Sequence, residues 1–240
     1  MCAANSKSRV ADMPLIVIEG LDGSGKATSA ALLEKRLTDE GKQTLKISFP
    51  DYESESSALV KMYLSGKFGD KPQDVNAYAA SAFYAVDRYA GYKSSWGKKL
   101  MRGAWVIADR YTTSNAVHQA SKLDGSERDA YLDWLYDFEF EKLGLPRPDC
   151  VIYLDVPPKV SQKLMADRYN GDSSRKDIHE KDVQYLEKSR AAALYAAQRL
   201  GWFIIRPCKD GQMLPPDAVL ELIYNKLKDF YGDRFTQNNT

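Results

Sequence analysis

The segment from Gly20 to Thr28 contains the residue types that bind phosphate groups. It follows the apolar run Leu15–Glu19 and opens a stretch with a helical pattern, Lys26–Glu40. Glycine lets a backbone turn its N–H groups toward phosphate oxygens, and the N-terminus of a following helix adds the positive end of a dipole. Lysine at this spacing supplies a mobile cation for the terminal phosphates. We expect the nucleotide-binding loop to comprise Gly20, Asp22, Gly23, Ser24, Gly25, Lys26, Ala27 and Thr28.

This loop departs from its usual pattern at Ala27, because the motif has Ser or Thr directly after the lysine to help hold Mg²⁺. Thr28 is one residue later, about 100° further around a helix. We therefore expect the Thr28 hydroxyl to meet a phosphate oxygen rather than to replace the missing ligand. A metal ion would then depend on water, nucleotide oxygens and a carboxylate elsewhere in the chain.

Asp109 and Arg110 follow a second apolar run that ends at Ala108. Arginine can bind a phosphate through two parallel N–H bonds, and a carboxylate can orient metal-bound water or a reacting phosphate. A structural ion pair is the alternative for this pair. Asp22, inside the glycine loop, would repel a triphosphate and is better suited to a neutral hydroxyl of a second substrate.

Tyr84 and Arg88 are four residues apart, so they share one face of a predicted helix. An aromatic ring and a guanidinium can stack on a base and donate to its carbonyl edge. Aromatic residues at helical spacing more often belong to a core. Asn115 and His118, soon after Arg110, could complete such a pocket.

The elements that must position these residues alternate between strand and helix. Unbroken apolar runs, typical of strands buried on both faces of a parallel sheet, occur at Leu15–Glu19, Thr44–Phe49, Trp105–Asp109, Cys150–Asp155 and Trp202–Arg206. Helical patterns occupy Lys26–Glu40, Ser56–Leu64, Val75–Arg102, Arg128–Leu143, Pro158–Tyr169, Asp177–Leu200 and Asp217–Tyr231. The class is α/β, and ligands of such sheets bind at the carboxyl ends of the strands.

Composition excludes several functional classes for this chain of 240 residues. With 34 basic and 33 acidic residues, the net charge of +1 does not favour a general nucleic-acid binder. No apolar run is long enough to span a membrane, and residues 1–13 have no signal-peptide pattern. Three distant cysteines indicate neither a disulfide framework nor a metal site, so we expect a reducing, cytoplasmic setting.

The polar segment between the helical patterns that end at Tyr169 and begin at Asp177 is either a solvated connector or a mobile lid. As a lid it would bring Arg168, Arg175 or Lys176 over bound phosphates.

Together these motifs resemble the thymidylate kinases, ATP-dependent enzymes that phosphorylate dTMP. The resemblance extends from Pro14 to about Tyr231, and it rests on Glu19–Lys26, Phe49-Pro50, Tyr84–Arg88, Asp109–Tyr111, Ser114-Asn115 and Leu143–Asp149. It implies a P-loop NTPase three-layer fold with a five-stranded parallel sheet and a lid at about 168–178. One domain would span 14–231, between tails at 1–13 and 232–240.

The resemblance also implies that ATP is the cosubstrate, that Mg²⁺ is the cofactor and that the protein is a homodimer. It further implies roles for individual residues. The residues that would act on the reacting phosphates are Lys26, Asp109, Arg110, Arg168 and Arg175. The metal ion would be bound by Asp109 and Glu180. The dTMP site would comprise Asp22 at the 3′-hydroxyl, Tyr84 and Arg88 at the base, Arg110 at the phosphate, and Phe49, Tyr52, Asn115 and His118. Tyr52 stands where many relatives carry a phosphate-binding arginine.

Three other functions compete with this interpretation. The first is another nucleotide or nucleoside kinase on the same scaffold; a nucleoside kinase would need a general base, for which Glu19 could be proposed. A GTP-binding switch would need an Asn-Lys-x-Asp motif, and the nearest stretch, from Asn225 to Lys228, ends in lysine. Ala27 leaves open a non-catalytic ATP-binding protein.

Overall fold

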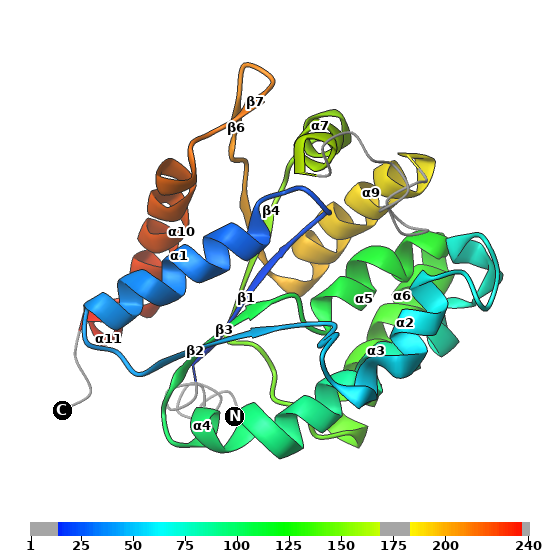
Figure 1. Cartoon of the computed structure of the whole chain (residues 1–240), viewed down its shortest axis with the longest axis horizontal. Helices are drawn as coiled ribbons and strands as arrows, with labels where there is room; N and C mark the ends of the chain where they lie inside the picture. The colour runs from blue at the N-terminus through cyan, green and yellow to red at the C-terminus, as the bar shows by residue number, and fades with distance from the viewer. Residues whose placement is uncertain (1–13, 169–182, 237–240) are drawn as a thin grey trace, which may run out of the picture.

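A five-stranded parallel sheet in the order β2-β3-β1-β4-β5 forms the centre of the molecule (Figure 1). The computed structural model describes residues 14–168 and 183–236. Each predicted strand is present with its ends within one residue, which confirms the α/β class. The strands are β1 (Leu15–Gly20), β2 (Thr44–Ser48), β3 (Trp105–Asp109), β4 (Cys150–Leu154) and β5 (Phe203–Ile205).

Helices cover both faces of this sheet, which explains why its central strands are unbroken apolar runs. On one face, Ile16 and Ile18 of β1 pack with α1 (Lys26–Asp39) and α10 (Pro216–Tyr231). On the other, Leu15 and Val17 pack with α5 (Thr113–His118) and α9 (Val183–Leu200). Figure 1 shows these two pairs of helices on opposite sides of the strands.

Two predicted helices contain a π-helical turn that the sequence pattern did not indicate. The range Val75–Arg102 divides into α3 (Ala77–Gly91), the π turn η3 (Tyr92–Trp96) and α4 (Gly97–Met101). The range Arg128–Leu143 divides into α6 (Gly125–Tyr136) and the π turn η5 (Asp137–Lys142). The remaining helices are η1 (Glu55–Ser57), α2 (Ala58–Leu64), η2 (Pro72–Asp74), η4 (Ala120–Lys122), α7 (Pro158–Arg168) and α11 (Asp233–Thr236).

Some short elements were not predicted at all. They include the antiparallel hairpin of β6 (Cys208–Lys209) and β7 (Gln212–Met213), and α11. The last lies where we expected a C-terminal tail, and its Phe235 is buried against Trp105 and Tyr231, so packed structure extends past Tyr231.

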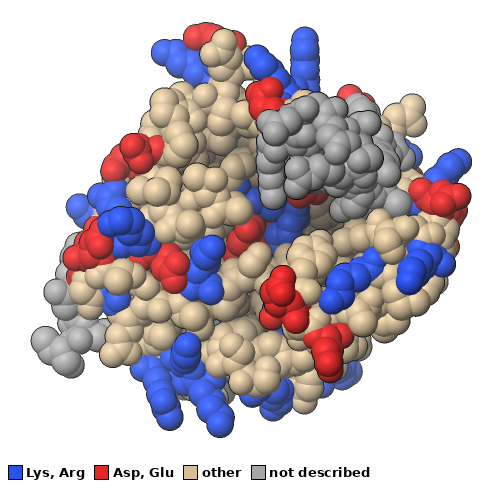
Figure 2. All heavy atoms as spheres, viewed as in Figure 1, with Lys and Arg blue, Asp and Glu red and all other residues tan. Residues whose placement is uncertain are grey.

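The charged surface matches the balanced composition. Figure 2 shows basic and acidic side chains interspersed over one face of the molecule. Within residues 14–168 and 183–236, no helix combines the length and the apolar character needed to cross a membrane. Most of the predicted lid and both chain ends lie outside the described residues.

Candidate active site

The loop between β1 and α1 has a backbone that is suited to binding an anion. Gly23 and Gly25 have φ angles of 77° and 81°, in the left-handed region that glycine adopts without strain. A Cβ atom on Gly23 would lie 2.4 Å from the carbonyl oxygen of Ser161, so glycine is needed where the loop meets α7. Helix α1 begins with no side-chain cap and no acidic residue in its first turn, which leaves its first N–H groups for a ligand.

Lys26 lies under this loop with only 7% of its surface exposed. Its Nζ donates to the carbonyl oxygen of Leu21 at 3.0 Å and lies 3.4 Å from Oδ1 of Asp22. Burial, followed by repulsion from Arg110, lowers the pKa of Lys26. An anion bound in the loop would offset both effects, because it attracts the ammonium charge of Lys26. Ala27 and Thr28 are both exposed on the first turn of α1.

Arg110 directly follows β3 in a left-handed conformation, with φ of 69°, which is unfavourable for a residue with a side chain. Its Nη1 donates to Oγ of Ser114 at 3.3 Å and contacts Nε2 of His118 at 3.2 Å, while its Nη2 forms an ion pair with Asp22. Burial opposes its charge, but Asp22 and Glu19 raise the pKa of Arg110. The guanidinium therefore stays charged and is fixed beside the loop.

Asp109 pairs in register with Ile18 of β1, which places it beside the start of the loop. Its Oδ1 is buried and has no hydrogen-bond partner in the described part of the chain. A carboxylate oxygen of this kind fits a hard cation such as Mg²⁺. The described residues contain no group of three or more His, Cys, Asp or Glu that could hold a metal ion on their own. Glu180, the second predicted metal ligand, lies outside them.

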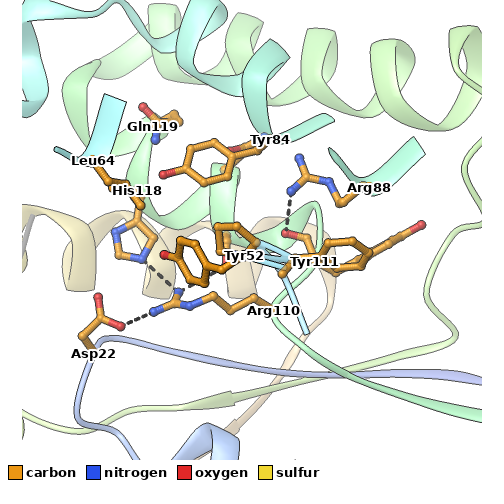
Figure 3. A pocket seen from close by; sticks show the side chains of 13 residues that line it. Asp22, Tyr52, Leu64, Tyr84, Arg88, Arg110, Tyr111, His118 and Gln119 are labelled. Atoms are coloured by element: carbon orange, nitrogen blue, oxygen red, sulfur yellow. Dashed lines mark hydrogen bonds and ion pairs between the residues drawn. The ribbon is translucent and has the colours of Figure 1, made fainter. Parts of the chain in front are cut away.

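A pocket of about 510 Å³, its open mouth included, lies next to Arg110 (Figure 3). Its wall brings together every residue that we expected to bind the monophosphate, although they come from separate parts of the chain. In Figure 3, Asp22 and His118 point to Arg110 from one side, and Tyr84 lies across the pocket from them. The lining residues are Asp22, Phe49, Pro50, Tyr52, Leu64, Tyr84, Arg88, Arg110, Tyr111, Ser114, Asn115, His118 and Gln119.

Arg88 is 1% exposed and is held by Glu139, a residue that sequence reasoning missed. Its Nε and Nη2 donate to the two carboxylate oxygens of Glu139 at 2.7 and 2.5 Å, and Nη1 lies 3.5 Å from the carbonyl oxygen of Tyr111. Burial opposes the charge, but Glu139 raises the pKa of Arg88. The guanidinium is therefore charged, and Nη1 is its least engaged nitrogen.

Two further residues shape the pocket without having been predicted to do so. Asp87 is 1% exposed, and its carboxylate accepts from the backbone N–H of Asp51 at 2.8 Å and from the Ser56 hydroxyl at 2.6 Å. These bonds hold the segment that carries Tyr52. Gln119 follows Asn115 by four residues, and this spacing could have indicated that both face the same site.

Asp155, at the end of β4, forms a separate cluster. Its carboxylate accepts from Nε of Arg190 at 2.7 Å and lies 3.3 Å from Nε of Arg206. Arg175 lies outside the described residues. Arg168 is the last residue of α7, and the description does not extend to its side chain.

The alternative functions find little support in this geometry. Glu19 is fully buried, its oxygens accept from the Gly20 amide and from the hydroxyls of Thr113 and Ser114, and it does not line the pocket. It is therefore not placed as a general base for a substrate hydroxyl. The stretch from Asn225 to Lys228 lies inside α10 rather than after a strand, which excludes it as a guanine-binding loop.

Comparison with known proteins gives one consistent result. The family model for thymidylate kinase matches residues 18–210. The thymidylate kinase of Mycobacterium tuberculosis is 32% identical over 215 residues, which cover 85% of this chain and 99% of that protein. The enzyme of Arabidopsis thaliana is 29% identical over 219 residues, covering 83% and 75%. A solved thymidylate kinase structure from Candida albicans shares the fold, with a TM-score of 0.67 at 20% identity over 94% of both chains.

Proposed function

This chain belongs to the thymidylate kinase family, and we propose on that basis that it transfers the γ-phosphoryl group of ATP to dTMP, yielding dTDP and ADP. The reaction is a step of nucleotide biosynthesis toward dTTP. The observation that carries the proposal for the site is the pocket itself. It combines an aromatic ring, two charged arginines and a carboxylate of the glycine loop around one space.

In this pocket dTMP would lie with its phosphate at Arg110 and its base between Tyr84 and Arg88. Arg110 is already charged and oriented, so it can bind the monophosphate without rearranging its own backbone. Asp22 faces Arg110 and would accept a hydrogen bond from the 3′-hydroxyl of the sugar. Phe49, Tyr52, Asn115 and His118 complete the walls.

ATP would place its phosphates on the loop from Gly20 to Thr28, with Lys26 turning from Leu21 and Asp22 to the β- and γ-phosphates. Mg²⁺, when bound, neutralises charge on these phosphates and fixes their geometry. Asp109 is the described residue that would help to hold it. Arg168 and Arg175 are proposed to act on the transferred phosphoryl group from the lid.

No general base is needed, because the nucleophile is a phosphate oxygen that is ionised at neutral pH. The protein contributes by bringing the two phosphates into line and by placing positive charge where negative charge accumulates. Lys26 and Arg110 flank this position from the loop and from the end of β3. We propose that Lys26 acts mainly on ATP and Arg110 mainly on dTMP.

The test is an assay of ADP release with ATP, Mg²⁺ and a panel of monophosphates: dTMP, dUMP, dCMP, dGMP and dAMP. We expect dTMP to give the highest kcat/KM. Arg110→Ala should raise the KM for dTMP and lower kcat while leaving the KM for ATP within about twofold. A wild-type enzyme that uses dCMP as well as dTMP, or none of the panel, would disprove the assignment.

We also propose a homodimer in the cytoplasm. Support for the dimer comes from exposed apolar side chains on α2 and α3: Leu59, Tyr78, Val86 and Tyr89 are between 37% and 52% exposed. Sedimentation of the wild type and of a Val86→Glu variant tests this surface. The variant should shift the population to monomers, and an unchanged sedimentation coefficient would place any interface elsewhere.

A further inference from the structure

A single buried carboxylate, that of Glu139, joins the polar groups of the base pocket. Besides the two bonds from Arg88, its Oε2 accepts from the hydroxyl of Thr112 at 2.7 Å and its Oε1 accepts from Nδ2 of Asn115 at 3.1 Å. Glu139 is 0% exposed and does not itself line the pocket. Its four donors come from three residues, two of which, Arg88 and Asn115, are pocket walls.

These bonds determine which atom Asn115 can offer to a ligand. A carboxylate and a backbone carbonyl only accept hydrogen bonds, so the atom of the Asn115 amide that faces them must be the NH₂ group. Both of its hydrogens are used, one toward Glu139 and one toward the carbonyl oxygen of Ser81 at 3.4 Å. The atom that Asn115 has left for a ligand is therefore Oδ1, an acceptor.

The same carboxylate determines what Arg88 offers. Nε and Nη2 are directed at Glu139, and Nη1 has only a long contact of 3.5 Å with the carbonyl oxygen of Tyr111, so Nη1 is the nitrogen with the most capacity left to donate to a ligand. The pocket thus presents a donor from Arg88 and an acceptor from Asn115. Thymine and uracil carry the complementary pair, a carbonyl oxygen at position 4 beside an N–H at position 3. Cytosine carries an amino group and a bare ring nitrogen at these positions, the opposite arrangement.

We propose that Glu139 is a positioning residue that fixes the hydrogen-bond polarity of the base pocket and thereby selects bases with the thymine edge over cytosine. The inference rests on the proposed function, since it names the group that sets substrate selectivity at that same site. Glu139 does not touch the substrate. It acts through Arg88 and Asn115.

The isosteric variant Glu139→Gln tests this role, because an amide replaces one acceptor by a donor. Arg88 donates to both carboxylate oxygens, so in either orientation of the new amide the guanidinium loses one of its two fixing bonds. Where the NH₂ group takes the place of Oε1, the Asn115 amide must also reverse and present its own NH₂ to the pocket. We expect kcat/KM for dTMP to fall by about tenfold or more, mainly through KM, and the preference for dTMP over dCMP to shrink by a similar factor.

An internal control separates positioning from general loosening of the pocket. dUMP and dTMP share the edge that Arg88 and Asn115 would read, so their ratio of kcat/KM should stay within about twofold in Glu139→Gln. The KM for ATP should also stay within about twofold. Glu141 is the matched control: it lies in the same turn, η5, but pairs with Arg147 at the surface, and Glu141→Gln should behave as wild type. An equal loss of activity toward dTMP, dUMP and dCMP would overturn the proposal.

A second measurement does not depend on the folding of any variant. 3-Methylthymidine 5′-monophosphate carries a methyl group where thymine has its N–H, so it cannot donate to Oδ1 of Asn115. It should compete with dTMP on the wild type at least about tenfold more weakly than dUMP does. If it competed as well as dUMP, the assigned polarity would be wrong. Failure of the wild type to prefer dTMP over dCMP would instead refute the proposed function.

Discussion

Nη1 of Arg110 lies 3.2 Å from Nε2 of His118, and this contact selects the tautomer of the neutral ring. Arginine can only donate, so Nε2 must accept, and the proton of the neutral ring is on Nδ1. His118 also stacks on Tyr185, with ring centroids 6.1 Å apart. The histidine therefore helps to orient the guanidinium from the side of the pocket opposite Tyr84.

Replacing this histidine tests its contribution to the phosphate site. His118→Phe keeps a ring to stack on Tyr185 but removes the acceptor. Arg110 keeps Asp22 and Ser114, so we expect the KM for dTMP to rise by about fivefold, corresponding to about 1 kcal/mol, with a smaller change in kcat. Steady-state kinetics with varied dTMP measure this. Tyr185→Phe, which removes only a hydroxyl bonded to the His118 carbonyl, is the control.

Lys26 should be essential for phosphoryl transfer and dispensable for folding. Its amine bonds only to Leu21 and Asp22 within the described chain, and burial lowers its pKa, so its charge does not favour the folded state. Lys26→Ala should reduce kcat by about 10³-fold, roughly 4 kcal/mol, without lowering the melting temperature. Lys35→Ala, at an exposed ion pair on the same helix, is the control. Activity within a few-fold of wild type would refute the role of the loop.

Gln119 contributes a buried amide oxygen with no hydrogen-bond partner in the described part of the chain. An unsatisfied buried acceptor costs about 1–3 kcal/mol, and in a pocket wall a ligand can satisfy it. Gln119→Leu should therefore keep or raise the melting temperature of the free protein but reduce its increase on addition of dTMP. Thermal melts with and without dTMP check this, and Gln198→Leu, at an exposed position on α9, should change neither value.

Much of this architecture was predictable from the sequence, because strands of a parallel sheet that are buried on both faces appear as continuous runs of apolar residues. The runs that became β1, β3 and β4 each begin with four apolar residues, and the polar residues at or directly after their ends gather at one edge of the sheet. Tyr84 and Arg88 line the same pocket, in agreement with their spacing of four, because α3 is a regular helix over that range.

Glu139 escaped prediction for a physical reason. It is 51 positions from Arg88, and it lies in η5, where the helix widens into a π turn. A π turn changes which side chains share a face of the helix. A period of 3.6 residues therefore no longer predicts which residues are neighbours there. The hairpin of β6 and β7 has only two residues in each strand, too few to show an alternating pattern.

Lys122, the last residue of η4, bonds to the segment before α3, and its ionisation should make stability depend on pH. Its Nζ donates to the carbonyl oxygen of Val75 at 2.7 Å and to the hydroxyl of Tyr63 at 3.1 Å. Burial lowers the pKa of Lys122 to about 7. In the unfolded chain the pKa of a lysine is about 10.4.

Between these two values the unfolded state holds a proton that the folded state has released, so the free energy of unfolding rises with pH across this window. Below about pH 7 both states are protonated and Lys122 adds no dependence. Lys122→Met removes the titrating group. The stability of wild type relative to this variant should therefore increase by about 2 kcal/mol from pH 7 to pH 9, as measured by urea unfolding. Lys188→Met, at an exposed position on α9, should show no such trend. A difference between wild type and Lys122→Met that stays constant over this range would mean that the lysine remains protonated in the folded protein.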